Sequence, residues 1–169
     1  MRNIILNLAI SLDGYIEGPA GEFDWCFTDQ DYGMGDFLAG VDTVVFGRKS
    51  YELMLRMDGS FAADKRRIVC SHTLDAVAPG WELLPGDAAA SLPQIKAAPG
   101  RDIWLFGGAE LAQALLSAGL VDEMLLSVHP LLLGGGKRLF DAAPTRIPLR
   151  LVAQDSYASG LLQVRYACG

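Results

Sequence analysis

Short apolar runs alternate with segments of helical periodicity along most of the chain. Apolar, partly β-branched runs are typical of strands, and they predict strands over 4–10, 43–46, 67–70, 103–106, 124–133, 149–157 and 161–166. The segments between them predict helices over 32–40, 50–57, 88–98 and 109–119. We expect Pro93 in the first turn of the third helix, and we expect Gly119 to end the fourth.

The order of these elements predicts the fold class. Strands that alternate with helices and are apolar throughout indicate a mostly parallel sheet covered on both faces. The last two strands flank the turn "YASG" and are expected to form an antiparallel hairpin. Because the chain shows no internal repeat, low-complexity tract or linker, we expect a single α/β domain over 1–169 with three layers, α/β/α.

The composition argues against some classes of partner. With 169 residues, 51% of them hydrophobic and 20% charged, the chain is suited to an ordinary globular core. Its net charge of −6 argues against nucleic acid as the main partner, because phosphate backbones require a basic surface. A local basic pocket for a small anion is still compatible with that charge.

The N-terminus and the cysteines bear on where the protein works. Asn3 and Asn7 interrupt the first apolar run, which therefore predicts a strand and not a signal peptide. No apolar stretch approaches the ~20 residues that span a bilayer, so we expect no membrane contact. Cys26, Cys70 and Cys168 are scattered and odd in number, which suggests no disulfide framework and a reducing cytoplasm. Neither C-x-x-C nor H-E-x-x-H occurs, so no metal site is expected.

The segment "VVFGRKSYE" (44–52) is the first junction that could carry chemistry. Gly47 allows a sharp turn after the strand, and Arg48 and Lys49 then place two cations beside a helix N-terminus that is itself positive. That arrangement is favourable if an anion is bound there. The other interpretation is that both cations are solvated and Ser50 only caps the helix.

The segment "FGGAEL" (106–111) is the second such junction. Gly107 and Gly108 have no Cβ, so a ligand can approach their backbone N–H groups closely, and the following helix directs its free N–H groups to the same point. A plain glycine turn is the alternative. Glu110 would repel a phosphate if it pointed inward, so we expect it to point outward or to bind a ligand hydroxyl.

Neither junction matches a common motif. G-x-G-x-x-G is absent from both, and "GGGKRLF" lacks the Ser or Thr and the leading glycine of a P-loop. No G-x-S-x-G occurs, which argues against a hydrolase of that type. We interpret Lys137 and Arg138, which follow the three glycines, as a solvated turn.

Five segments taken together resemble the dihydrofolate reductase-like superfamily. They occur in the family's order and span nearly the whole chain: "SLDGYIEG" (11–18), "VDTVVFGRKSYE" (41–52), "IVCSHTL" (68–74), "LFGGAEL" (105–111) and "HPLLLGGGKRLF" (129–140). The chain is most similar to small reductases akin to the C-terminal domain of the bifunctional riboflavin-biosynthesis deaminase/reductase. The deaminase half of that enzyme needs H-x-E and P-C-x-x-C, which are missing here, so the resemblance implies a stand-alone reductase.

The resemblance implies NADPH as cofactor and assigns both junctions to it. Gly47, Arg48, Lys49 and Ser50 would hold the adenosine-side phosphates, with Arg48 suited to a dianionic 2′-phosphate. The remaining cofactor contacts would be Ser71 and His72 for the 2′-phosphate and adenine, Gly107, Gly108, Ala109 and Glu110 for the pyrophosphate, and Ala9, Ile10 and Ile16 for the nicotinamide. The loop from Ile16 to Gln30 would close over the nicotinamide.

The proton donor is the least defined part of the site that the resemblance implies. Dihydrofolate reductases use a carboxylate on the first helix, and Asp31 falls near that place, with Asp29 as a rival. Both lie in "TDQDYGMGD", which could equally be a solvated helix start. Asp13 in "SLDG" is expected to cap a turn and not to act in catalysis. The "DWCF" segment departs from true dihydrofolate reductases.

We therefore expect an NADPH-dependent reductase that transfers hydride to a conjugated nitrogen heterocycle, such as a pterin or a riboflavin-precursor pyrimidine. A true dihydrofolate reductase and a non-catalytic nucleotide- or flavin-binding regulatory protein are the alternatives. The continuous apolar stretch "MLLSVHPLLL" (124–133) suggests the seam of a homodimer.

Overall fold

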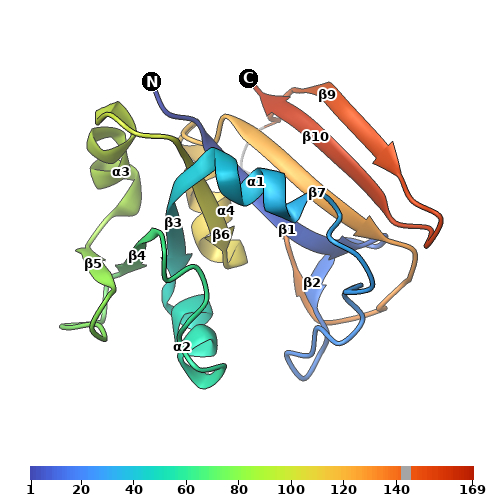
Figure 1. Cartoon of the computed structure of the whole chain (residues 1–169), viewed down its shortest axis with the longest axis horizontal. Coiled ribbons are helices and arrows are strands. Elements are labelled where there is room, and N and C mark those ends of the chain that lie inside the picture. The colour runs from blue at the N-terminus through green and yellow to red at the C-terminus, as the bar shows by residue number, and fades with distance from the viewer. Residues whose placement is uncertain (142–145) are drawn as a thin grey trace.

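The computed structural model describes residues 1–141 and 146–169, and strands and helices alternate through its first part (Figure 1). The strands are β1 (Ile4–Ser11), β2 (Tyr15–Glu17), β3 (Val41–Gly47), β4 (Arg66–Ser71), β5 (Glu82–Pro85), β6 (Asp102–Gly107), β7 (Glu123–His129), β8 (Lys137–Arg138), β9 (Leu149–Ser156) and β10 (Leu162–Cys168). The helices are α1 (Met34–Gly40), α2 (Arg48–Arg56), α3 (Ala88–Ala97) and α4 (Ala109–Ser117).

Eight strands form one sheet in the order β5-β4-β3-β6-β1-β7-β10-β9. The first six run parallel, whereas β10 is antiparallel to both β7 and β9. The predicted fold class is therefore confirmed, including the hairpin around "YASG". In the turn that follows β9, the Gly160 amide donates to the Tyr157 carbonyl and closes that hairpin.

Each face of the sheet carries its own layer of helices and its own core. On the face covered by α3 and α4, Leu6, Leu105 and Leu115 are fully buried. On the face covered by α1 and α2, Phe46 and Trp104 pack with other aromatic side chains. Because burying one such side chain contributes about 1.5–3 kcal/mol, the two cores hold the helix starts firmly against the strand ends.

The structure differs from the predicted elements in six places. Strands β2, β5 and β8 were not predicted, because such short segments show no clear alternation of apolar residues. Strand β7 ends at His129, since Pro130 has no N–H with which to continue the ladder. Pro93 lies in the interior of α3, so its expected place in the first turn is wrong. Helix α2 begins at Arg48, so the two cations are its first residues.

The 124–133 stretch is not a single strand: burial within the sheet explains the apolarity of its first part, whereas Leu132 after the strand is 72% exposed. Strand β7 lies inside the sheet between β1 and β10, with Met124 and Leu126 buried. Among the described helices, none is long and apolar enough to cross a bilayer.

Strands β2 and β8 form a second, two-stranded sheet that Asp13 ties to the end of β1. Its carboxylate accepts hydrogen bonds from the Ser11 hydroxyl (2.6 Å), from the Leu133 amide (3.1 Å) and from the Gly134 amide (2.8 Å). Asp13 thus joins two loops that are far apart in the sequence and sets the path that leads into β8.

We predict that Asp13→Asn loosens this loop. The hydrogen bond from Ser11 is the main cause that lowers the pKa of Asp13 to about 2; burial opposes it, and the hydrogen bonds from Gly134 and Leu133 add to the lowering. The stabilisation is therefore complete above the ordinary carboxyl pKa of 3.8 and is lost as the pH falls toward about 2. Amide hydrogen exchange at Gly134 should be faster in the variant at neutral pH. Asp87→Asn, which removes the same charge at the N-cap of α3 and keeps the acceptor oxygen, should leave that exchange unchanged. Equal exchange in the wild type and in Asp13→Asn would contradict the assignment.

Candidate functional site

The carboxyl ends of three neighbouring strands meet at one edge of the sheet. In register, Gly47 at the end of β3 pairs with Cys70 of β4, and Phe46 pairs with Gly107 of β6. Helices α2 and α4 begin directly after two of these strands. The two junctions singled out in the sequence are thus side by side, at the edge of an open α/β sheet where ligands usually bind.

The glycines of the two junctions are in direct contact. A Cβ on Gly47 would lie 3.2 Å from the Gly108 nitrogen and 3.5 Å from the Gly107 carbonyl oxygen, so any other residue there would push the junctions apart. Gly107 has φ +116°, which side chains rarely adopt, and the space beside it is open. The Gly107–Gly108 peptide bond is cis. The result is a shallow backbone surface that a ligand can approach closely.

Helices α2 and α4 begin at this surface without a side-chain cap. Their N-cap residues are Gly47 and Gly108, and neither start has a side-chain hydrogen bond. By contrast, Asp87 accepts from the Ala89 amide at the start of α3 (2.9 Å), and Asp31 accepts from the Gly35 amide at α1 (3.1 Å). Two bare helix starts, each equivalent to roughly half a positive charge, therefore face the same point.

Three basic side chains surround the two helix starts. Arg48 pairs with Glu52 one turn along α2 (3.1 Å), and Glu110 lies between Lys49 (3.7 Å) and Lys137 (3.5 Å). Glu110 points outward into solvent, as expected, with 76% of its side chain exposed. These contacts between exposed groups are weak, so an anion of higher charge can displace the carboxylates.

Lys137 and Arg138 do not form the solvated turn that the sequence suggested. They make up β8, which pairs with β2, and the guanidinium of Arg138 lies 4.7 Å above the ring of Tyr15. Pairing with β2 brings Lys137 to the first turn of α4. Sequence reasoning placed this cation in a solvated turn because the segment that pairs with it is distant in the chain.

At the third strand end, that of β4, Ser71 stabilises the turn that follows the strand. The Ser71 hydroxyl is buried and accepts from the amides of Thr73 and Leu74, both at 3.1 Å. It therefore shapes the turn that presents His72, which is exposed. Ser50, half-buried, lies where its hydroxyl oxygen would be 3.8 Å from a Cβ on Gly108.

The predicted nicotinamide contacts fall on different faces. Ala9 lies on the α1/α2 face of β1 and is half-buried, whereas the side chain of Ile10 points into the core beneath α3 and α4. Ile16 also packs against that core. On the α1/α2 face of the sheet, β1 therefore presents the side chain of Ala9, while Ile10 offers only its backbone. Ala109 is buried at the start of α4 and offers only its backbone.

Both candidate proton donors are exposed. Asp31 accepts from the Gly35 amide, and Asp29 accepts from the hydroxyl of Tyr32 (2.7 Å). Each carboxylate thus organises the segment that leads into α1. The structure does not place either one in a buried environment, so a catalytic role for Asp31 stays a prediction.

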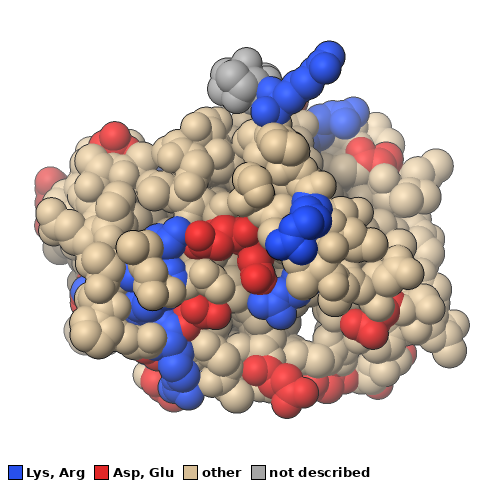
Figure 2. Space-filling view, turned by 90° about the horizontal axis from the view of Figure 1, so that it is seen from above, with Lys and Arg blue, Asp and Glu red and all other residues tan. Residues whose placement is uncertain are grey.

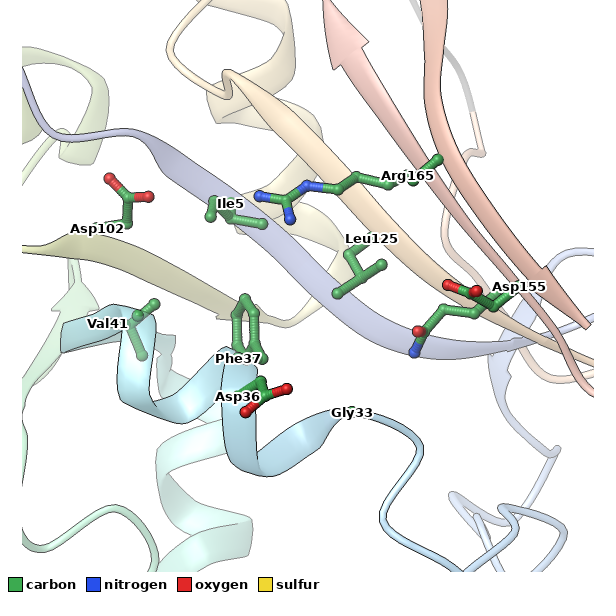
Figure 3. Close-up of a pocket in the computed structure, with 12 residues that line it drawn as sticks. Ile5, Gly33, Asp36, Phe37, Val41, Asp102, Leu125, Asp155 and Arg165 are labelled. Carbon is green, nitrogen blue, oxygen red and sulfur yellow. The ribbon is translucent and has the colours of Figure 1, made fainter. Parts of the chain in front are cut away.

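A groove of about 290 Å³ opens beside α1, on the α1/α2 face of the sheet. Figure 3 shows Phe37 on α1 opposite Leu125 on β7, with Ile5 on β1 forming the floor. Its polar wall comes from Asp36 on α1 and from residues of β9 and β10. The groove opens at the end of the molecule opposite the glycine surface, and that end is hollowed between acidic and basic side chains (Figure 2).

The charges of this groove are mostly negative. Asp36, Asp102 and Asp155 line it, and Arg165 is its basic residue. The guanidinium of Arg165 is already paired with Glu123 at 2.5 Å. The groove therefore offers carboxylates to a ligand and no free cation among its lining residues.

Asn7 is a candidate that sequence reasoning did not identify. It lies on β1 between Ile5, which lines the groove, and Ala9, on the same face of the sheet, and it is only 5% exposed. Among the described residues, no hydrogen bond to its side chain is found, although its backbone carbonyl accepts from the indole of Trp104 (2.9 Å). A lone amide within the buried run "IILNLAI" was the signal that could have revealed it.

Comparisons with known proteins agree with this geometry. Residues 2–162 match the RibD C-terminal domain family. The Bacillus subtilis protein YyaP, which is uncharacterised, is 38% identical, and the match covers 98% of this chain and 94% of YyaP.

Solved structures show the same fold. A Shewanella protein provisionally assigned to riboflavin biosynthesis is 27% identical, with a TM-score of 0.89 over 99% of each chain. Dihydrofolate reductase from Enterococcus faecalis, at 17% identity, has a TM-score of 0.74 and is matched over 96% of its length and 99% of this chain. The resemblance that five short segments suggested is confirmed, and the chain belongs to the RibD C-terminal domain family.

Proposed function

We propose that the protein is an NADPH-dependent reductase that transfers hydride to a conjugated nitrogen heterocycle. The observation that carries the proposal is the packing of Gly47 against Gly107 and Gly108, which creates a backbone surface between two uncapped helix starts. A pyrophosphate suits this surface, because backbone N–H groups and helix starts both favour a bound anion.

The residues present fit the cofactor. Lys49 and Lys137 lie beside the start of α4 and would hold the pyrophosphate, while Arg48 and Ser50 at the start of α2 would hold the 2′-phosphate. His72 is exposed at the neighbouring strand end and would border the adenine. NADPH would supply the hydride. The Enterococcus faecalis dihydrofolate reductase with this fold was solved with NADP(H), which supports the same cofactor here.

The substrate would lie between Ala9 and the groove beside α1. The Asn7 side chain has one donor group and one acceptor group. A pterin or pyrimidine has an N–H or amino group next to a C=O group, so the Asn7 amide could bond to both. Because the groove carries carboxylates and its arginine is already paired with Glu123, it favours a neutral or amino-bearing heterocycle over one with a phosphate tail. Phe37 would stack on the ring.

Titration of NADPH into the protein, followed by nicotinamide fluorescence, tests the cofactor assignment. We expect saturable binding, and its absence at millimolar cofactor would contradict the proposal. Arg48→Ala should weaken NADPH binding by roughly 1–3 kcal/mol, or about 5- to 150-fold, because a charge-assisted contact is lost. NADH, which has no 2′-phosphate, should lose much less.

Arg66→Ala is the matched control for Arg48→Ala. Arg66 is similarly exposed and also pairs with a glutamate, Glu82, at 2.8 Å, but it lies at the amino end of β4. NADPH binding should be unchanged in this variant. Equal losses for NADPH and NADH in Arg48→Ala would overturn the 2′-phosphate role.

We propose Asp31 as the proton donor to the reduced heterocycle. Asp31→Asn should lower kcat by roughly 10²–10⁴-fold and leave NADPH binding intact, because the amide oxygen can still accept from Gly35 while the side chain can no longer donate a carboxyl proton. Asp29→Asn is the comparison variant. Unchanged turnover in Asp31→Asn would remove the assignment.

NADPH binding without oxidation across pterins and pyrimidines, with and without phosphate, would instead favour a non-catalytic nucleotide-binding role.

We also propose a homodimer in the cytoplasm. Three of the exposed apolar side chains, Leu149, Leu151 and Val152, are on the edge strand β9, whereas none is on the interior strand β7. An exposed apolar edge strand is readily covered by a second copy. Sedimentation at micromolar concentration should give twice the chain mass, and Leu151→Asp should give a monomer. A monomeric wild type would refute the dimer.

The three cysteines are free, which supports a reducing compartment.

A further inference from the structure

His129, at the end of β7, is buried and makes two hydrogen bonds that define its protonation state. It is only 2% exposed. Its Nδ1 lies 2.9 Å from the Ser127 carbonyl oxygen, and its Nε2 accepts from the Phe27 amide at 3.0 Å. Because a carbonyl can only accept, Nδ1 must carry the hydrogen, and Nε2 must be bare to accept from Phe27. The geometry therefore requires the neutral Nδ1–H tautomer.

The same imidazole is the packing surface for the "DWCF" segment. The rings of Trp25 and Phe27 meet it edge-on, with centroids 5.2 and 4.9 Å away. Among the hydrogen bonds of residues 1–141 and 146–169, the one from Phe27 is the only bond that joins 19–31 to a distant part of the chain. The others within this loop are local, such as that from Cys26 to Phe23 (3.1 Å).

This anchor lies beside the place proposed for hydride transfer. His129 pairs in register with Ser11 of β1, one strand spacing of about 4.8 Å away. Ala9 lies two residues earlier on the same face as Ser11. The loop 19–31 is therefore fastened next to the part of β1 that would border the nicotinamide.

We propose that His129 is a positioning residue that latches the loop 19–31 beside the carboxyl end of β1 while its imidazole is neutral, and that releases the loop when the imidazole is protonated. Its importance for catalysis rests on the proposed reductase function. The latch itself does not, because it follows from the contacts of His129 alone. It accounts for two features that the family resemblance left without a role, namely the histidine of "HPLLLGGG" and the "DWCF" segment.

Protonation breaks the latch because it places a hydrogen on Nε2, facing the Phe27 N–H. Burial lowers the pKa of His129 below its usual value of 6.5, and the carbonyls of Ser127 and Ile10 oppose this only in part. The latch is thus fully formed above the ordinary histidine pKa. Since the unfolded and open states take up the proton first, it weakens as the pH falls below about 6.5 and is lost when the pH reaches the folded-state pKa.

Other titratable groups do not replace the histidine in this role. In the loop, Asp24 is exposed, and burial together with Asp24 raises the pKa of Cys26 to about 11, so that thiol stays neutral. After β1, Asp13 is engaged with Leu133 and Gly134. At the start of β7, Glu123 is paired with Arg165. None of these described groups is hydrogen-bonded to the imidazole.

The test is NMR on the protein without cofactor, from about pH 8 to about pH 5. Imidazole ¹⁵N shifts should show the Nδ1–H tautomer of His129 at pH 8. The exchange of the Phe27 amide, corrected for its intrinsic pH dependence, should rise by about tenfold or more in step with His129 protonation. An Nε2–H tautomer at pH 8, or Phe27 exchange that does not follow His129, would overturn the latch.

Three variants separate the latch from general stability. His72→Gln, at the one other histidine of the chain, should leave the pH response unchanged. His129→Gln keeps an acceptor that does not titrate, so Phe27 should stay protected with no acid transition. His129→Phe keeps the ring and should leave Phe27 unprotected at pH 8, with circular dichroism to confirm folding. If His129→Phe does not fold, the titration of the wild type and the behaviour of His129→Gln are sufficient to test the latch.

The latch and the reductase function can fail separately. Loss of NADPH binding would end the proposed function and leave the Phe27 measurement untouched. If turnover is found, His129→Gln should remove the decline in kcat below about pH 6.5 that the wild type shows. An identical acid limb in both proteins would exclude His129 as a positioning residue for catalysis.

Discussion

The contact between Gly47 and the Gly107–Gly108 backbone is the constraint on which the candidate site depends. At 3.2 Å from a Cβ position to the Gly108 nitrogen, the two strand-to-helix junctions are as close as backbones without side chains allow. The parallel register of β3 and β6 brings them to one height, and the two cores on either side of the sheet hold them there. Helices α2 and α4 consequently direct their uncapped first turns at the same small region.

That arrangement is costly unless something negative is bound. Two helix starts, Arg48, Lys49 and Lys137 are all positive, and Glu52 and Glu110 compensate them only through exposed, weak pairs. A chain with an overall charge of −6 has thus concentrated basic groups at one edge of its sheet. The groove beside α1, which opens at the opposite end, is lined by three carboxylates and by one arginine that is already paired with Glu123. A phosphate-bearing cofactor at one end and a neutral or amino-bearing heterocycle at the other suit this separation of charge.

The loop between β2 and α1 connects these two regions, and it depends on few contacts. Its fastening to His129 is a single hydrogen bond and two edge-on rings, while Tyr32 fastens its far end through Ser159 and Gln163. A segment held by so few bonds is suited to opening and closing without disturbing the sheet. The rigid glycine surface is thus suited to binding a ligand, and the lightly held loop is suited to controlling access to it.

Local chemistry in the sequence determined the parallel strands, the four helices, the closing hairpin and the two glycine junctions. Apolar periodicity, glycine conformation and the charge beside a helix start are properties of neighbouring residues, so they can be interpreted without a fold. Only the tertiary structure decided that Lys137 reaches Glu110 and that Ile10 faces the core. It also decided that the Asn7 side chain, 5% exposed, has no hydrogen bond to the described residues, and that Phe27 bonds to a histidine 102 residues away. Each of these depends on strand pairing between distant segments, and no local pattern specifies which distant segments will meet.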